Sequence, residues 1–219
     1  MQLELQVTAG SGSSEVINSS SSSNSGYGGF KWSNLTVSET GSAAGASLTL
    51  TVSGLVNSLG ENFFPYDSLT IEAIGSGFTG LPTSSDAFLT TVNSSGTYSD
   101  STSGDQVSMH GTATSTATVS NTATNFAPPG STSSDVSYTI PSTSINATRA
   151  GFGTPSSYSL DTFASFTIKS TSSSYNGTFV TTLAGSAPAA VTLPGSGPLT
   201  IVGGLVVVGG LAVRRRFKV

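Results

Sequence analysis

Apolar and polar side chains alternate one by one along much of this chain. Leu3, Leu5 and Val7 alternate with polar residues, and Leu48, Leu50 and Val52 alternate with Thr and Ser. Successive side chains of a β-strand point to opposite faces, so this two-residue period is typical of strands with one buried face. The chain is therefore expected to build its core from sheets.

Further segments of the same kind are bounded by Gly, Ser, Asn or Pro clusters, as strands separated by turns are. No 3.6-residue apolar period is sustained before Pro198, so no helix is expected there. We predict an all-β, two-sheet antiparallel sandwich, immunoglobulin-like or jelly-roll, followed by one C-terminal hydrophobic helix. The expected strands cover residues 3–7, 30–37, 48–53, 69–73, 87–92, 136–140, 160–169 and 178–183.

Charge is scarce and unevenly placed. Charged residues make up 8% of the chain, against about 25% in typical domains, and Ser and Thr supply much of the remaining polarity. Before Val191 stand three basic residues (Lys31, Arg149, Lys169) and all eleven acidic residues, a net charge of −8. Nucleic acid is bound by clustered Lys and Arg, so we predict no nucleic-acid partner.

The chain has no cysteine. This excludes disulfides, zinc–thiolate sites, thiol catalysis and haem attachment through Cys. Core packing and sheet hydrogen bonds must then hold the domain together. We predict no cofactor and no metal.

The C-terminal segment is different in character. An apolar run, residues 198–213, is followed by Arg214, Arg215, Arg216 and Lys218. Such a basic cluster stays on the cytoplasmic side of a bilayer, so we expect it to act as a membrane stop, with the preceding chain outside. Residues 199–213 span about 22 Å as a helix, less than the ~30 Å hydrocarbon core. So short a span favours a retention signal that is later cut; a buried core helix is the alternative.

These boundaries divide the chain into three parts. We predict a β-sandwich ectodomain at 1–183, a linker of small residues, Pro and Gly with a sorting motif at 184–197, and a hydrophobic anchor with a basic tail at 198–219. Small residues and Pro are typical of a short tether between a domain and an anchor.

The tail resembles the C-terminal sorting signals of the PEP-CTERM class, in particular the variant that reads Val-Pro-Leu-Pro. Val191, Thr192, Leu193 and Pro194 correspond to that motif, with Thr192 in place of its first Pro. The resemblance implies processing by a membrane-embedded exosortase-like enzyme and a link to exopolysaccharide. Residues 193–197 also resemble the sortase motif Leu-Pro-x-Thr-Gly, with Ser196 for Thr, which would imply attachment to the cell wall.

We therefore expect an exported bacterial surface or extracellular-matrix protein with a structural or adhesive role, and not an enzyme. It would work at the cell envelope or outside the cell, held in the membrane by its C-terminal helix, whose end is cytoplasmic before processing. The alternative is a surface-displayed carbohydrate-binding module. Trp32, grouped with Tyr27 and Phe30, is the candidate glycan contact, although core packing is the commoner role of such rings. Phe63, Phe64 and Tyr66 form a second aromatic group.

Other patterns support weaker expectations. Residues 75–80 match G-x-G-x-x-G, but no helix signal follows them, so a turn is expected rather than a phosphate site. His110 is the only histidine and no G-x-S-x-G motif surrounds a serine, which argues against a catalytic triad. The loop from Asp100 to Asp105 is expected to be a solvated turn rather than a calcium site.

Two biased segments complete the sequence. Residues 19–25 are nearly all serine and are expected to form a mobile loop. Residues 112–124 alternate Thr with small side chains and are expected to form one edge or surface strand. A flat ladder of Thr would also suit a repetitive polymer or a neighbouring chain.

Overall fold

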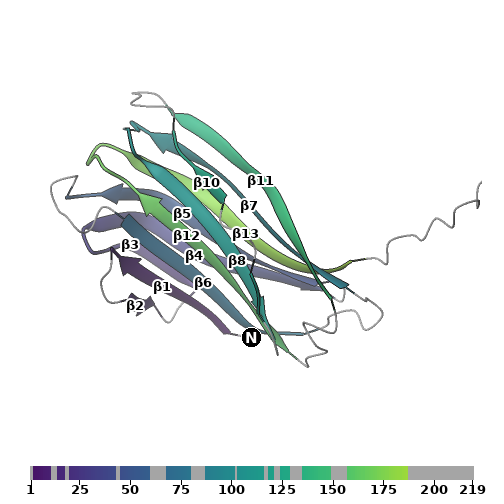
Figure 1. Ribbon diagram of the computed structural model, residues 1–219. Helices are drawn as coiled ribbons and strands as arrows, with labels where there is room; N and C mark the ends of the chain where they lie inside the picture. Colours follow the sequence, from purple (N-terminus) through teal and green to yellow (C-terminus); the bar gives the residue numbers. More distant parts are fainter. Residues whose placement is uncertain are drawn as a thin grey trace, which may run out of the picture. The chain divides into compact units, whose positions relative to one another are not determined.

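The computed structural model describes residues 2–10, 14–17, 20–42, 45–59, 68–79, 87–101, 103–115, 118–120, 124–128, 135–148 and 157–186. The chain divides into two units, residues 1–186 and residues 187–219. The described residues all lie in the first unit, where they form thirteen strands in two antiparallel sheets. Figure 1 shows the two sheets as stacked layers.

The first sheet has the order β10-β8-β12-β6-β1-β2, with β9 paired to β8, and the second has the order β11-β7-β13-β5-β4-β3. We call them sheet A and sheet B. Sheet A comprises β1 (Gln2–Ala9), β2 (Ser14–Ile17), β6 (Ser68–Phe78), β8 (Gln106–Thr114), β9 (Thr118–Ser120), β10 (Thr124–Phe126) and β12 (Tyr158–Thr167). Sheet B comprises β3 (Ser21–Tyr27), β4 (Phe30–Ser42), β5 (Gly45–Asn57), β7 (Ala87–Ser99), β11 (Val136–Thr148) and β13 (Ser174–Ser186).

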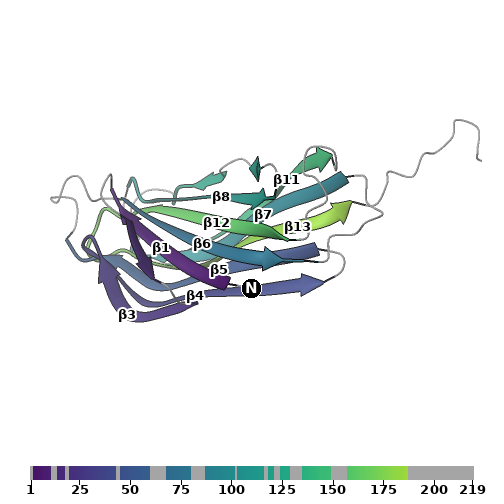
Figure 2. The same ribbon diagram turned by 90° about the horizontal axis from the view of Figure 1, so that it is seen from below.

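The last two strands join distant parts of the sequence. β12 lies between β6 and β8 in sheet A, and β13 lies between β5 and β7 in sheet B. The centre of each sheet is therefore completed only when these two C-terminal strands are in place. In Figures 1 and 2 the strands of both sheets run in nearly the same direction, as in aligned sandwiches.

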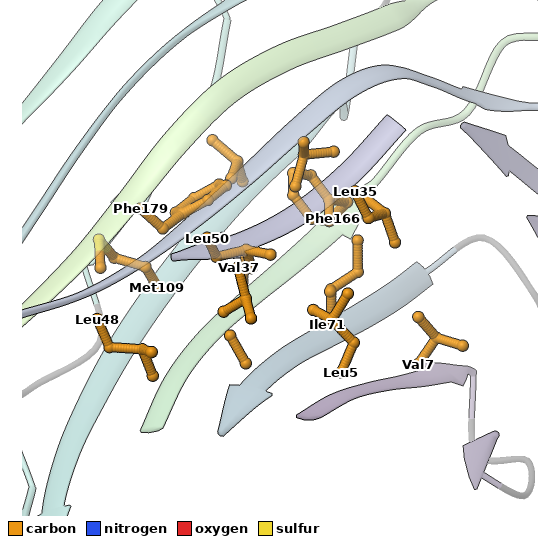
Figure 3. Packing of buried hydrophobic residues seen from close by; sticks show 14 of the residues in the cluster. Leu5, Val7, Leu35, Val37, Leu48, Leu50, Ile71, Met109, Phe166 and Phe179 are labelled. Atoms are coloured by element: carbon orange, nitrogen blue, oxygen red, sulfur yellow. The ribbon is translucent and has the colours of Figure 1, made fainter. Parts of the chain in front are cut away.

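The core lies between the sheets and is built by the alternation seen in the sequence. The expected strand segments coincide with strands of the structure, although the segment 160–169 runs two residues past the end of β12 at Thr167. The alternating apolar residues that marked them, among them Leu5, Leu48 and Leu50, point inward. Figure 3 shows Leu5 and Ile71 of sheet A facing Leu50 and Val37 of sheet B. Burial of this apolar surface is the main force that holds the two sheets together. The prediction of an all-β two-sheet sandwich is thus confirmed.

A buried hydroxyl pair joins the central strands of the two sheets across the core. The hydroxyl of Thr162 on β12 donates to Oγ1 of Thr181 on β13 at 2.8 Å, and both side chains are buried. Gly111 on β8 makes room for this pair, since a Cβ there would overlap Thr181 and lie 2.6 Å from Val92. The pair fixes how β12 and β13 face each other, because an unpaired buried hydroxyl is unfavourable.

A cluster of tyrosines fills one end of the core. The hydroxyls of Tyr138 and Tyr175 share a hydrogen bond, and Tyr138 is also bonded to Ser94 Oγ at 3.2 Å. Tyr98 donates its hydroxyl to the carbonyl oxygen of Gln106 at 2.6 Å and packs edge-on against Tyr175. Burial raises the pKa of both Tyr98 and Tyr175 far above the ordinary tyrosine value. These phenols therefore stay protonated, and Tyr98 acts as a fixed donor to the Gln106 carbonyl.

The alternation is interrupted along one line across sheet B. In β4 and β5, two consecutive residues lie outside the core: Ser33 with Asn34, and Ser53 with Gly54. Asn176 and Gly177 of β13 do the same where the β13–β5 register shifts. Extra residues of this kind bend a sheet. Side chains satisfy the backbone at the bend, because Gly54 N–H donates to Asn176 Oδ1 at 2.8 Å and Ser33 Oγ donates to Ser53 O at 2.8 Å.

Two expectations about biased segments were wrong. The serine run is not a loop, because residues 21–27 form β3, the edge strand of sheet B. Its backbone pairs with β4, and that pairing outweighs the low strand preference of serine and glycine. Residues 112–124 do not form a single strand either. The chain leaves β8 after Thr114 and returns as β9 and then β10, both paired to β8, so only the edge location is confirmed.

Four other expectations need correction or fall outside the described residues. Residues 75–78 of the G-x-G-x-x-G match continue strand β6 rather than form a turn. Strand β13 extends to Ser186, three residues past the predicted end of the ectodomain at residue 183. The expected C-terminal helix and the aromatic group Phe63, Phe64 and Tyr66 lie outside the described residues. Within the described part of the chain, no helix is long and apolar enough to cross a membrane.

Candidate functional site

A hollow beside the β3–β4 hairpin has a volume of about 710 Å³. Residues 24–33, together with Gly54 and Ser58, line it. We call it the hairpin groove. Its size falls within the ~300–1,000 Å³ of small-ligand sites. Ser33 and Gly54 belong to the bend of sheet B, so the irregularity of that sheet shapes one wall.

The hairpin itself is built by two glycines. Gly28 and Gly29 connect β3 to β4 and have φ angles of +57° and +87°, which a two-residue type I′ turn requires. Both N–H and Oγ of Ser58 donate to the carbonyl oxygen of Gly29, at 2.9 and 2.5 Å. The turn is closely packed, because a Cβ on Gly28 would overlap Ala9 and one on Gly29 would overlap Leu59. The groove therefore has a fixed rim.

Trp32, the candidate glycan contact, lies in the floor of this groove. Its side chain is only 3% exposed and belongs to the core. The indole N–H donates to Ser22 Oγ on β3 at 3.2 Å, which ties the edge strand to its neighbour. A ring so covered offers no free face for stacking on a sugar. Trp32 thus shapes the groove from below, and its structural role is core packing.

Two other side chains of the groove reach its surface. Tyr27 is half-buried and Lys31 is exposed, on facing strands of the hairpin. Of the described residues that line the groove, Lys31 is the one that carries a charge. Tyr27 belongs to the aromatic group expected from the sequence, whereas Lys31 was not singled out there. The Gly28-Gly29 pair is the signal that predicts the hairpin. In its register Tyr27 pairs with buried Phe30 and Lys31 pairs with Gly26, so the two side chains lie on opposite faces of the hairpin.

The outward face of sheet A carries a second distinctive group, which is acidic. Glu72 on β6 lies diagonally between Glu4 on β1 and Asp161 on β12 in the strand register. Desolvation, and then the charges of Asp161 and Glu4, raise the pKa of Glu72 to about 7. Burial also raises the pKa of Asp161, although the hydrogen bond that Thr112 donates to its carboxylate at 2.8 Å acts to lower this pKa. His110 on the same face does not offset this charge, because burial lowers its pKa.

We expect this acidic group to make the domain less stable as the pH rises. A carboxyl whose pKa is raised on folding binds more protons in the native state, so its stabilising contribution is lost between pH 4.5 and about 7. Glu72→Gln should raise the free energy of unfolding at pH 8 by on the order of 1 kcal/mol, after discounting for solvent screening, and change it little at pH 4.5. Urea unfolding at the two pH values measures this. An equal effect of the substitution at both would contradict the account.

The outward face of sheet B is different, because Lys31 beside the hairpin groove is the only charged side chain among the residues described on it. One row across neighbouring strands contains Ser21, Thr36, Thr51, Thr178 and Ser95, each the register partner of the next. A second row joins Thr40, Ser47, Thr182 and Thr91, and in it Ser47 Oγ and Thr182 Oγ1 are 2.9 Å apart. We call this the hydroxyl face. Its hydroxyls repeat about every 4.8 Å across the strands and about 6.7 Å along them.

The remaining candidates have ordinary structural surroundings. His110 stacks on Phe163 with ring centroids 4.1 Å apart. Asp105 is buried, and its Oδ1 accepts the backbone N–H of Lys169 at 2.9 Å, whereas Asp100, Ser103 and Gly104 of the same loop are exposed. Over the described ranges, no three acidic or histidine side chains gather in an arrangement that would hold a metal ion.

The residues of the predicted sorting signal lie outside the described part of the chain. These are Val191, Thr192, Leu193 and Pro194 of the motif, and Arg214, Arg215, Arg216 and Lys218 of the membrane stop. No protein-family model matches the chain, and no curated protein is similar to it in sequence.

Proposed function

We propose that this protein is an exported bacterial surface or extracellular-matrix protein with a structural or adhesive role, whose C-terminal tail is a sorting signal cut by an exosortase-like enzyme. The observation that carries this proposal is the order of the tail: a Leu-Pro motif, an apolar run, and then four cations in the last six residues. That order holds a chain in a membrane with its bulk outside. The sortase-type variant of the proposal differs only in the enzyme and in the wall polymer attached.

The domain is consistent with such a role. It needs no disulfide, since the chain has no cysteine and its core runs the length of two stacked sheets. Its two outward faces differ, one acidic and one lined with uncharged hydroxyls. A broad neutral hydroxyl face supports contact with hydrated polymers at a surface, because each hydroxyl both donates and accepts hydrogen bonds.

A second candidate function is a surface-displayed carbohydrate-binding module, and the hairpin groove favours it. The groove combines an aromatic ring, Tyr27, with several hydroxyls and glycines in a space of about 710 Å³. Aromatic rings with a few convergent polar groups are the usual lining of small-ligand sites. Both functions place the domain outside the cell, and they are compatible with each other.

The tail proposal predicts a charge-dependent location. Replacing Arg214, Arg215, Arg216 and Lys218 by Ser should let the tail pass through the bilayer, so the protein appears unanchored in the periplasm or the medium. Replacing the three Arg by Lys keeps the charge and should leave retention unchanged. Membrane flotation combined with added protease on intact cells measures both. Equal membrane retention of the Ser variant and the original chain would contradict the proposal.

A further inference from the structure

Strand β13 is the last described strand before the tail, and it lies in the middle of sheet B. It ends at Ser186, and the predicted sorting motif begins at Val191. Its whole length pairs with β7, and residues 174–184 of it also pair with β5. Tension that enters the domain through the tail passes into β13 first, because the chain gives it no other path.

The direction of β13 decides how such tension acts on the hydrogen bonds that hold it. β13 begins at one end of the sandwich, where Ser174 is the register partner of Val56 and Ser99, and it ends at the other, where Ser186 pairs with Ala87. Both neighbours are antiparallel to it, so the interstrand hydrogen bonds lie perpendicular to its axis. A pull between the two ends acts along this axis and loads the bonds on both edges together. A pull across the strands would break them one pair at a time.

Side chains strengthen the hold on β13. The hydroxyl of Thr162 on sheet A donates to Thr181, and Asn176 Oδ1 accepts the N–H of Gly54 on β5. The side chains of β13 that point into the core are fully buried, namely Tyr175, Phe179, Thr181 and Leu183. The chain has no cysteine, so these contacts and the backbone pairs resist force without a covalent brace.

β12 and β13 also join the two halves of the sandwich. In the described part of the chain, no strand of β1 to β6 is paired with a strand of β7 to β11. Without β13, sheet B would divide into β11-β7 and β5-β4-β3, and without β12, sheet A would divide between β8 and β6. Withdrawal of β13 therefore opens the whole domain, so we expect it to yield in one step rather than strand by strand.

We propose that β13 is the strand that carries tension from the held C-terminal end of the domain to the opposite end of the sandwich. This inference rests on the anchored, adhesive role proposed above, and it adds the path by which force crosses the domain. The path is the same whether the C-terminal end is held by the uncut tail or by a wall polymer joined to it.

The test pulls the full-length chain, in mild detergent, in two directions with optical tweezers. One handle is joined to the C-terminal end and the other to a single introduced cysteine, which is unique because the chain has none. Ser103→Cys places it in the exposed turn after β7, at the Ser174 end of β13. Gly41→Cys places it on β4 at the Ser186 end, where a Cβ meets nothing within 4 Å.

At one pulling speed, the unfolding force should be at least about twofold higher for Ser103→Cys than for Gly41→Cys, because only the first geometry loads β13 along its axis. Unfolding from Ser103→Cys should occur in a single step. Adding Thr181→Val, which removes the hydrogen bond to sheet A, should lower that force. Thr36→Val on the outer face of β4 is the matched control and should leave it unchanged.

Equal forces in the two geometries would overturn the inference, as would a lower force for Ser103→Cys. A Ser103→Cys force that Thr181→Val leaves unchanged would overturn the assigned support from sheet A. Both handle variants should keep the melting temperature of the original chain, which shows that the two pulls start from one fold. The sorting proposal is tested on the tail in cells, so none of these outcomes decides it, and its failure would leave the difference in force intact.

Discussion

Trp32→Ala is expected to lower the free energy of unfolding by roughly 3–5 kcal/mol, a large part of the ~5–15 kcal/mol that holds a typical domain together. The ring is 3% exposed and packs in the core. Removing it also removes the hydrogen bond from the indole N–H to Ser22 Oγ, so β3 loses a side-chain hydrogen bond to β4. Urea unfolding followed by tyrosine fluorescence and circular dichroism measures the change.

The outcome also decides how Trp32 should be used in binding studies. Val16→Ala is a suitable control, because Val16 is 45% exposed on β2 and its loss should change stability by no more than about 0.5 kcal/mol. A Trp32→Ala variant as stable as this control would mean that the ring is not a core residue. It would then return to consideration as a direct ligand contact. Loss of glycan binding in an unfolded variant carries no such information.

Gly177→Ala is expected to destabilise the domain by about 3 kcal/mol, at the upper end for an added methyl group in a full core. A Cβ at this position would overlap the hydroxyl of Tyr175 and lie 2.6 Å from its Cζ and 2.8 Å from the Ser95 carbonyl oxygen. Tyr175 has no room to move, because it is fully buried and bonded to Tyr138. Thermal and urea unfolding report the loss.

A double-mutant cycle identifies the cause. Tyr175→Phe alone should cost about 1 kcal/mol for the lost hydrogen bond, and in the Gly177→Ala background it should recover part of the lost stability by removing the overlapping oxygen. Gly41→Ala is the matched control, since a Cβ there meets nothing within 4 Å. Additive effects of the Gly177 and Tyr175 substitutions would contradict a direct clash between them.

The architecture was predictable because one face of each sheet is buried in the core. Leu48, Leu50 and Val52 of β5 are all buried, and the intervening Thr49 and Thr51 lie on the outer face. The period of two therefore records burial directly. The order of the strands was not predictable, because β12 and β13 enter the middle of the two sheets from far along the sequence, and nothing local encodes that pairing.

The errors arose where tertiary pairing outweighs local preference. Ser21 to Tyr27 contains little that favours a strand, yet β4 requires a partner for its backbone groups, and the Gly28-Gly29 turn supplies one. In the G-x-G-x-x-G match, Gly75 is needed because a Cβ there would press on Phe78 and Leu48. Gly77 has a φ of +82° next to a register shift. These glycines serve packing and a bulge within β6.

The candidate site was predicted in part. The aromatic residue chosen from the sequence, Trp32, does line the groove, but its ring is the floor and not the binding surface. Exposure depends on which face of β4 each residue takes, and the bend at Ser33 and Asn34 changes that face within two residues. A simple alternation cannot reveal this. Tyr27, grouped with Trp32 in the sequence, pairs with buried Phe30 and lies on the core side of the hairpin.

Mass analysis of the C-terminus in protein from its native cells examines the sorting proposal most directly. If the tail is a signal that a membrane enzyme cuts, the mature chain should end within or close to residues 193–197, and the apolar run with its four cations should be missing. Recovery of an intact chain ending at Val219 would contradict processing and leave only a retained hydrophobic tail.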